Sequence, residues 1–137
     1  MPTYELTEQE LAHRKEIADR ARKMVLTQIP VEDQDGISLT LGYLGYYMQL
    51  SFSPLHPLMV IYLAKALAHP GGTGKKKLTN ELNLRSVLGS HAINEEVGCY
   101  SYRALHWLDT ELTPERFFEI LDRCVEEASR GYARLVS

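Results

Sequence analysis

The sequence contains little cysteine, with only Cys99 and Cys124 among its 137 residues. The two do not form a CxxC pair, so their spacing favours neither a zinc site nor a redox motif. Isolated thiols are typical of proteins in a reducing compartment. We therefore expect a cytoplasmic protein without a disulfide framework.

Positive charge is also scarce. The chain has 15 Lys and Arg residues against 18 Asp and Glu residues, which gives a net charge of −3. Proteins that bind nucleic acid carry clustered positive charge, and attachment to an acidic membrane surface has the same requirement. The composition therefore argues against nucleic acid and against membrane as partners.

Long apolar runs are missing as well. The most apolar stretch, residues 55–68, is interrupted by His56, Pro57 and Lys65, whereas a membrane-spanning helix needs about 20 apolar residues in succession. The N-terminus lacks the basic and apolar segments of a secretory signal. We expect a soluble protein.

What the chain does contain is an ordinary globular composition, with 45% hydrophobic and 24% charged residues. No internal repeat and no long linker divides the sequence. Residues 1–137 are therefore expected to form a single domain.

The first third of the chain predicts a helix followed by a turn. Thr7 and Glu10 have the spacing of a capping box, and apolar residues at helical spacing follow them. Pro30 ends this helix, because the residue before a proline is pushed out of helical conformation. The polar segment 32–36 then predicts a turn.

Three strands are expected next. Apolar and polar residues alternate in segments 37–41 and 47–52, as in half-buried strands. The continuous apolar run 58–63 predicts the third strand. Its continuation, 64–68, is compatible with either strand or helix.

The C-terminal half predicts two helices around a hairpin. Residues 75–88 favour a short helix ended by Gly89. Segments 91–93 and 99–107 read as strands. Thr113 and Pro114 then suit the start of a long helix. Its wide apolar face comprises Phe117, Phe118, Ile120, Leu121, Cys124, Val125, Ala128 and Leu135.

Together these elements predict an α+β fold of order α-β-β-β-α-β-β-α. A five-stranded antiparallel sheet would be flanked by the N-terminal and the C-terminal helix.

Residues at the element boundaries of segment 81–135 form a pattern, namely Leu82, Asn83, Gly89, Ile93, Gly98, Tyr102 and the helix start Leu112-Thr113-Pro114-Glu115. This pattern resembles the superfamily of type III secretion chaperones and YbjN-type proteins. Segment 37–63 is similar to it only in the order of its strands. Residues 69–77 are an insertion that the superfamily does not require.

The resemblance implies a small acidic protein, often a homodimer, that binds another polypeptide and catalyses no reaction. Secretion chaperones of this superfamily typically hold an extended effector segment against their sheets. We therefore expect a chaperone-like protein-binding module with no cofactor, no metal and no catalytic residue.

A small-ligand or anion-binding domain is the alternative function, and it would use the Gly71–Lys77 loop. Glycine amides, a helix N-terminus and ammonium groups all attract phosphate. A Walker loop is excluded, because His69 and Lys76 stand where that motif needs glycine and Ser or Thr. A solvated loop is the simpler interpretation. The candidate anion-binding residues are Gly72, Gly74, Lys75, Lys76 and Lys77.

The histidines offer little chemistry. None of the five forms a pair at metal-ligand spacing, and no catalytic triad is apparent. His91 and His106 flank Gly98, so pairing of their strands would bring them together as a metal or acid–base pair. Two histidines on a sheet surface are the simpler interpretation.

Tyrosine, by contrast, is abundant, with 8 residues. Its ring offers a large contact area with a polar tip, and it is enriched at interfaces. The same rings can equally cover one face of a sheet against a helix. We predict that an exposed sheet face binds the partner polypeptide, or that a partner strand adds to an open sheet edge. The candidate residues are Tyr47, Gln49, Tyr100 and Tyr102.

Overall fold

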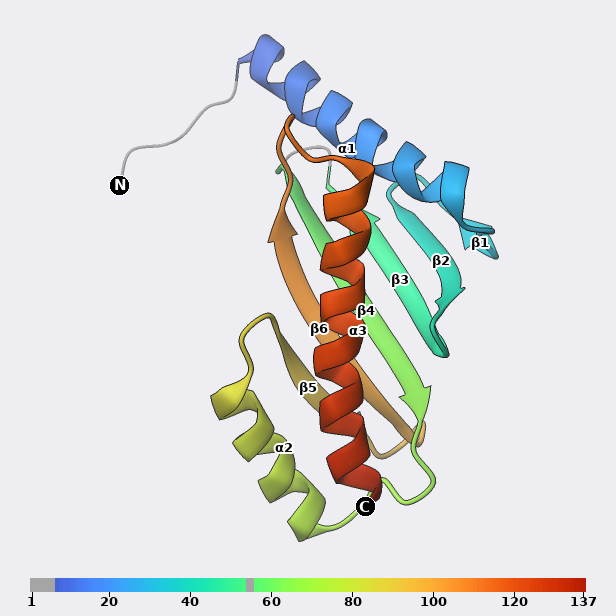
Figure 1. The fold of residues 1–137 in the computed structure, drawn as a ribbon, viewed down its shortest axis with the longest axis vertical. Coiled ribbons are helices and arrows are strands. Elements are labelled where there is room, and N and C mark those ends of the chain that lie inside the picture. The colour runs from blue at the N-terminus through green and yellow to red at the C-terminus, as the bar shows by residue number, and fades with distance from the viewer. Residues whose placement is uncertain (1–6, 54–55) are drawn as a thin grey trace.

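The computed structural model describes residues 7–53 and 56–137. It is an α+β fold in which α1 and α3 lie across one face of a single sheet, and α2 packs beside its β5 edge (Figure 1). The elements are α1 (Glu8–Gln28), β1 (Asp33–Gln34), β2 (Ser38–Tyr43), β3 (Tyr46–Phe52), β4 (Leu58–Ala66), α2 (Thr73–Arg85), β5 (Gly89–Asn94), β6 (Cys99–Trp107) and α3 (Pro114–Val136).

The sheet has six strands in the order β1-β2-β3-β4-β6-β5, and all neighbouring strands are antiparallel. The order of elements predicted from the sequence is confirmed, with one strand more than expected. Segment 32–36, predicted as a turn, contains β1, which pairs with Leu39 and Thr40 of β2.

The extra strand depends on a contact from α1 that local sequence does not reveal. The Asp35 carboxylate accepts hydrogen bonds from the amides of Ile37 and Ser38 and closes the turn after β1. The Arg22 guanidinium donates to the carbonyls of Asp35 and Gly36 and fixes that turn on the helix.

Two further boundaries differ from the sequence prediction. The ambiguous segment continues β4 as far as Ala66, because Ala66 pairs with Cys99 of β6. Helix α2 ends at Arg85 and is capped by Ser86, whose hydroxyl donates to the Leu82 carbonyl. Gly89 therefore begins β5 and does not cap the helix. A Cβ atom at Gly89 would lie 2.5 Å from the Arg103 carbonyl oxygen, so only glycine permits this close approach.

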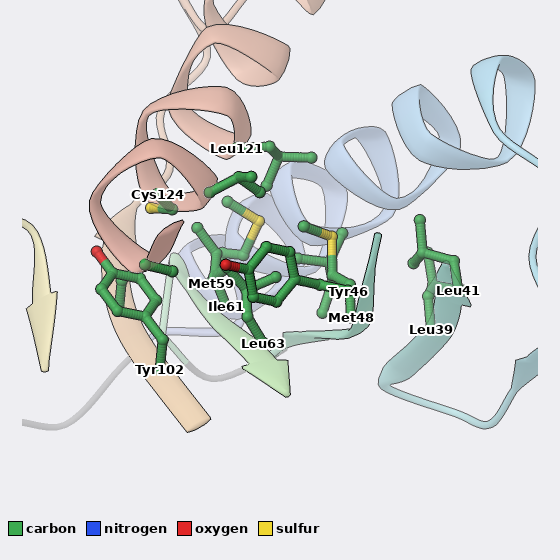
Figure 2. Packing of buried hydrophobic residues seen from close by; sticks show 14 of the residues in the cluster. Leu39, Leu41, Tyr46, Met48, Met59, Ile61, Leu63, Tyr102, Leu121 and Cys124 are labelled. Atoms are coloured by element: carbon green, nitrogen blue, oxygen red, sulfur yellow. The ribbon is translucent and has the colours of Figure 1, made fainter. Parts of the chain in front are cut away.

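The core lies between the sheet and the two helices that cross it (Figure 2). Register-paired residues share a face of the sheet, and on the covered face these rows are apolar. One row is Leu39, Leu50, Ile61 and Ala104, and the next is Leu41, Met48, Leu63 and Tyr102.

Helix α3 covers the middle of this face. It starts as predicted, with the Thr113 hydroxyl accepting from the Arg116 amide and Pro114 in the first turn. Its apolar stripe is confirmed in the core through Phe117, Leu121, Cys124, Ala128 and Leu135. Among the described residues, no helix combines the length and apolar character required to cross a membrane.

Shortening Leu121 to alanine tests the role of α3. Leu121 is fully buried, so Leu121→Ala should lower the free energy of unfolding by about 2–5 kcal/mol, measured by urea denaturation. Arg123→Ala, at an exposed position of the same helix, is the control and should cost less than about 1 kcal/mol. Equal losses in the two variants would show that α3 does not hold the core together.

Candidate functional site

The face of the sheet opposite α3 is the first candidate site. It displays Tyr47 of β3 beside Tyr62 of β4, with ring centroids 6.5 Å apart in an edge-to-face arrangement. Further along the same face, Val60 pairs with Leu105 and Leu58 pairs with Trp107. We call this set, Tyr47, Gln49, Leu58, Val60, Tyr62, Leu105 and Trp107, the open-face patch.

The open-face patch presents large apolar side chains to solvent. Tyr47 is 47%, Leu105 51% and Trp107 68% exposed. Gln49, between Tyr47 and the end of β3, is half-buried and pairs with Tyr62. Contiguous exposed apolar surface rimmed by polar groups is typical of interaction sites.

The predicted partner surface is corrected in one respect. Tyr47 and Gln49 lie on the open face, and whether they bind a partner stays a prediction. Tyr100 and Tyr102 are fully buried on the opposite face beneath α3. The register explains this, because Leu63 of the core pairs with Tyr102 and therefore shares its face. The other interpretation of these two rings, that they cover the core, is the right one.

Leu105 and Trp107 were not among the predicted site residues. The sequence carried the signal that could have found them, since alternation along 99–107 puts both residues on the face that Tyr100 and Tyr102 do not use.

A buried carboxylate organises the region between α2 and α3. Glu127 of α3 is only 8% exposed. Its oxygens accept from the amides of Val87 at 2.9 Å, Leu88 at 3.2 Å and Gly89 at 2.9 Å, and from the Tyr102 hydroxyl at 2.7 Å. We call this arrangement the Glu127 latch. It fixes the connection from α2 to β5 on α3.

A second polar network lies next to the latch. His91 of β5 is 4% exposed, and its Nδ1 is 2.5 Å from the Tyr100 hydroxyl while its Nε2 is 2.8 Å from the Ser86 hydroxyl. A neutral imidazole donates from one ring nitrogen and accepts at the other, so one of the two hydroxyls accepts from the ring and the other donates to it. Gly131 of α3 makes room for the ring, because a Cβ atom there would lie 2.6 Å from His91.

Burial sets the protonation of this region. It lowers the pKa of His91, while the Glu127 charge opposes the shift in part. Burial by itself would raise the pKa of Glu127, but the hydrogen bonds from Val87, Tyr102, Gly89 and Leu88 lower it below its ordinary value. At neutral pH a neutral imidazole therefore stands beside an ionised carboxylate.

The remaining reactive groups have no arrangement suited to catalysis. Burial raises the pKa of the Cys124 thiol to about 11, so it stays protonated near neutral pH. The expected closeness of His91 and His106 is wrong, since His91 pairs with Tyr102 and His106 pairs with Met59. The described residues contain no group of three or more His, Cys, Asp and Glu side chains able to hold a metal ion.

The lysine segment differs from the predicted loop. Helix α2 begins at Thr73, so Gly74 and Lys75–Lys77 are helical, and only Gly71 and Gly72 precede the helix. Glycine at 72 allows this start, since its φ is +120°. Lys76 forms an exposed ion pair with Glu95 at 3.4 Å. Anion binding by Gly72, Gly74 and the lysines stays a prediction.

A groove beside α3 is the last candidate site. Its volume is about 520 Å³, and it lies between α3, the second half of β6 and the segment that enters β5. Its apolar lining includes Ile61, Ala104, Ile120 and Cys124, and the charged side chains along it are Arg116, Glu119, Arg123, Glu126, Glu127 and Arg130.

Comparison with known proteins places the fold. No protein-family model matches the sequence, and no curated protein matches it either. Among solved structures, YbjN of E. coli is similar with a TM-score of 0.60 and 10% identity, over 86% of this chain and 87% of that one.

Two chaperone complexes are similar as well. A chain of the HopA1–SchA chaperone–effector complex matches with a TM-score of 0.57 and 10% identity, over 90% of this chain and 96% of that one. A chain of the complex of the Yersinia pestis type III secretion chaperone SycH matches with a TM-score of 0.55 and 11% identity, over 85% and 98%. The fold of type III secretion chaperones and YbjN, expected from residues 81–135, is confirmed.

The His91 network predicts a dependence of stability on pH. The folded pKa of His91 lies below its ordinary 6.5, so the unfolded chain takes up the proton first. The contribution of neutral His91 to the free energy of unfolding is therefore complete above about pH 6.5, and it is lost as the pH falls towards the folded pKa. His91→Gln should flatten this fall between about pH 7.5 and pH 5.5 in urea denaturation.

His69→Gln serves as the control, since His69 is exposed and outside the network. It should leave the wild-type dependence intact. Glu127 does not contribute in this window, because its folded pKa lies below 4.5. A His91→Gln protein with the wild-type slope would show that His91 is not held neutral by burial.

Proposed function

We propose that this chain is a chaperone-like, non-catalytic protein that holds an extended segment of a partner polypeptide on the open face of its sheet. The observation that carries the proposal is the open-face patch, where Tyr47, Leu105 and Trp107 are exposed on the same face of the sheet as half-buried Tyr62. The fold supports it, since similar chains occur in complexes of chaperones with polypeptides.

The patch has the composition of a binding surface. Trp and Tyr side chains dominate the binding energy of many interfaces, and burial of one such ring contributes about 2 kcal/mol or more. Gln49, Ser51 and Ser101 stand on the same face between the apolar groups. An extended segment with alternating apolar and polar side chains would match this mixture.

We propose a protein without catalytic activity because the titratable side chains with shifted pKa values stabilise the fold. The most buried of them, His91, Glu127, Tyr100 and Tyr102, hydrogen-bond to one another or to neighbouring backbone and side chains between β5, β6 and α3. Cys99 and Cys124 are free thiols, which supports a cytoplasmic location.

We also propose that the protein forms a homodimer through the end of α2. Leu84 and Val87 are each 87% exposed, and Leu88 is 45% exposed. Three large apolar side chains within five residues form an unusual concentration on a soluble surface, and contact with a second copy would remove them from water.

Site-directed photo-crosslinking tests partner binding. A photoreactive amino acid replaces Tyr47 in the native cell, and its adduct is identified by mass spectrometry. The captured polypeptide, once purified, should bind Tyr47→Ala at least about fivefold more weakly than wild type, as expected for loss of an interface ring. Asn80, exposed on α2, is the control position and should not yield the same adduct. Equal affinity for wild type and Tyr47→Ala would overturn the proposed surface.

Sedimentation tests the dimer. At micromolar concentration the wild type should sediment as a dimer, and Val87→Asp should sediment as a monomer because it buries an unpaired charge in the contact. Val97→Asp changes an equally apolar residue, 73% exposed in the β5–β6 turn, and should remain dimeric. A wild-type monomer would remove the dimer proposal.

A further inference from the structure

Arg103 of β6 lies on the open face of the sheet. It pairs with Tyr62 of β4, which pairs in turn with Gln49 of β3. Paired residues share a face, so Arg103 stands on the side that carries the open-face patch. Its side chain is exposed there.

The strands around Arg103 offer it no carboxylate. No Asp or Glu occurs in β3, β4, β5 or β6, all of which the structure describes in full. Their one other Lys or Arg residue, Lys65, pairs with Tyr100 on the covered face, where its ammonium group lies 4.9 Å from the centroid of the Tyr46 ring. Across the described part of the chain, Arg103 forms no ion pair and no cation–π contact. No neighbouring side chain therefore neutralises its charge.

The carboxylate in the same cross-strand row belongs to Asp33, which pairs with Thr40 at the β1 edge of the sheet. Strand β1 lies four strands from β6. Neighbouring strands are about 4.8 Å apart, so the two strand positions are separated by about 19 Å. Salt screens exposed charges beyond about 10 Å. Asp33 therefore does not compensate Arg103.

The neighbours of Arg103 are large and apolar on one side and short on the other. Tyr62 lies across from it on β4, and Leu105 and Trp107 follow along β6 on the same face. On the β5 side its paired residue is Ser90, which is exposed. A carboxylate can thus approach the guanidinium over β5, while apolar side chains of the same ligand contact Leu105 and Trp107.

A partner that covers the open-face patch would also remove water from Arg103. A charge that loses its water without gaining a partner is strongly unfavourable. The guanidinium presents its N–H donors in a planar fork, and a carboxylate accepts two parallel hydrogen bonds from it. Backbone carbonyls of the partner would accept hydrogen bonds but leave the charge unneutralised. The covering segment therefore needs Asp or Glu at this point.

The spacing along β6 determines where apolar residues of that segment stand relative to the acid. Side chains on one face of a strand recur at every second residue, about 6.6 Å apart. Arg103, Leu105 and Trp107 follow this repeat. An extended segment that runs along β6 has the same repeat, so residues two and four positions from the acid lie over Leu105 and Trp107.

We propose that Arg103 determines which polypeptide binds: the bound segment carries an Asp or Glu that forms a bidentate ion pair with Arg103, and large apolar residues two and four positions away that cover Leu105 and Trp107. This inference rests on the proposed function and specifies the chemistry of the partner. A second copy of the chain fits this face less well, because a symmetric contact would bring two Arg103 side chains together.

Peptide selection tests the inference. Peptides are selected on the full chain from a random library displayed on phage, and those that bind Tyr47→Ala more weakly than wild type are assigned to the open-face patch. We expect these peptides to contain Asp or Glu with large apolar residues at the second and fourth positions from it. Their affinities for the variants are then measured by fluorescence anisotropy.

Arg103→Gln should lower the affinity of these peptides at least about tenfold, as expected for loss of one partner of a desolvated ion pair. Arg103→Lys should give a smaller loss, because it keeps the charge without the planar fork. Arg134→Gln is the matched control, since it removes the same charge at an exposed position of α3, and it should bind like wild type. Circular-dichroism melts verify that all three variants are folded.

A double-mutant cycle identifies the partner of Arg103. Replacing the acid of the peptide by its amide should cost about as much as Arg103→Gln, and the two changes together should cost little more than either alone. Additive losses would show that the acid does not contact Arg103 and would overturn the inference.

The remaining outcomes separate this inference from the proposed function. Peptides that respond to Tyr47→Ala but not to Arg103→Gln would leave the open-face patch as a binding surface and overturn the role of Arg103. A selection without any peptide that responds to Tyr47→Ala would count against both proposals. Conversion of a wild-type dimer to a monomer by Arg103→Gln would assign this face to a second copy and contradict the inference.

Discussion

The structure depends on one buried carboxylate. At the junction of α2, β5, β6 and α3, the Glu127 carboxylate accepts hydrogen bonds from three backbone amides and from the Tyr102 hydroxyl. Hydrogen bonds to a charged group contribute about 1.5–3 kcal/mol each, so the set outweighs the cost of burying the charge. The latch lies directly before the start of β5 at Gly89, and Val87 and Leu88 beside it are exposed. The groove beside α3, which Val87, Leu88 and Glu127 help to line, adjoins this junction.

Side chains of the core and side chains of the open-face patch alternate along the strands. Helix α3 covers the face that carries Leu63 and Tyr102, and the polar tips of the buried rings are satisfied by α3 and β5. The opposite face keeps Tyr47 and Trp107 in solvent. The core therefore lies on the covered face, and the residues of the open-face patch lie outside it.

The sequence was sufficient for the fold because its signals are local. The cap at Thr113, the stripe from Phe117 to Leu135 and the alternation in β2 and β3 each follow from short-range spacing. The predictions from sequence are wrong where contacts between residues far apart in the chain determine the structure. Arg22 fixes β1, Glu127 places Gly89 in β5, and the β4–β6 register puts Tyr100 and Tyr102 inside. Of the four predicted partner residues, only Tyr47 and Gln49 therefore lie on the open face.

Hydrogen exchange measured by NMR tests the Glu127 latch most directly. The account predicts that the amides of Val87, Leu88 and Gly89 exchange slowly in the wild type, because the carboxylate holds them. In Glu127→Gln those amides should exchange much faster, while amides in the centre of the sheet, such as that of Met48, keep their protection. Unchanged exchange at residues 87–89 would contradict the claim that this carboxylate fixes the connection from α2 to β5.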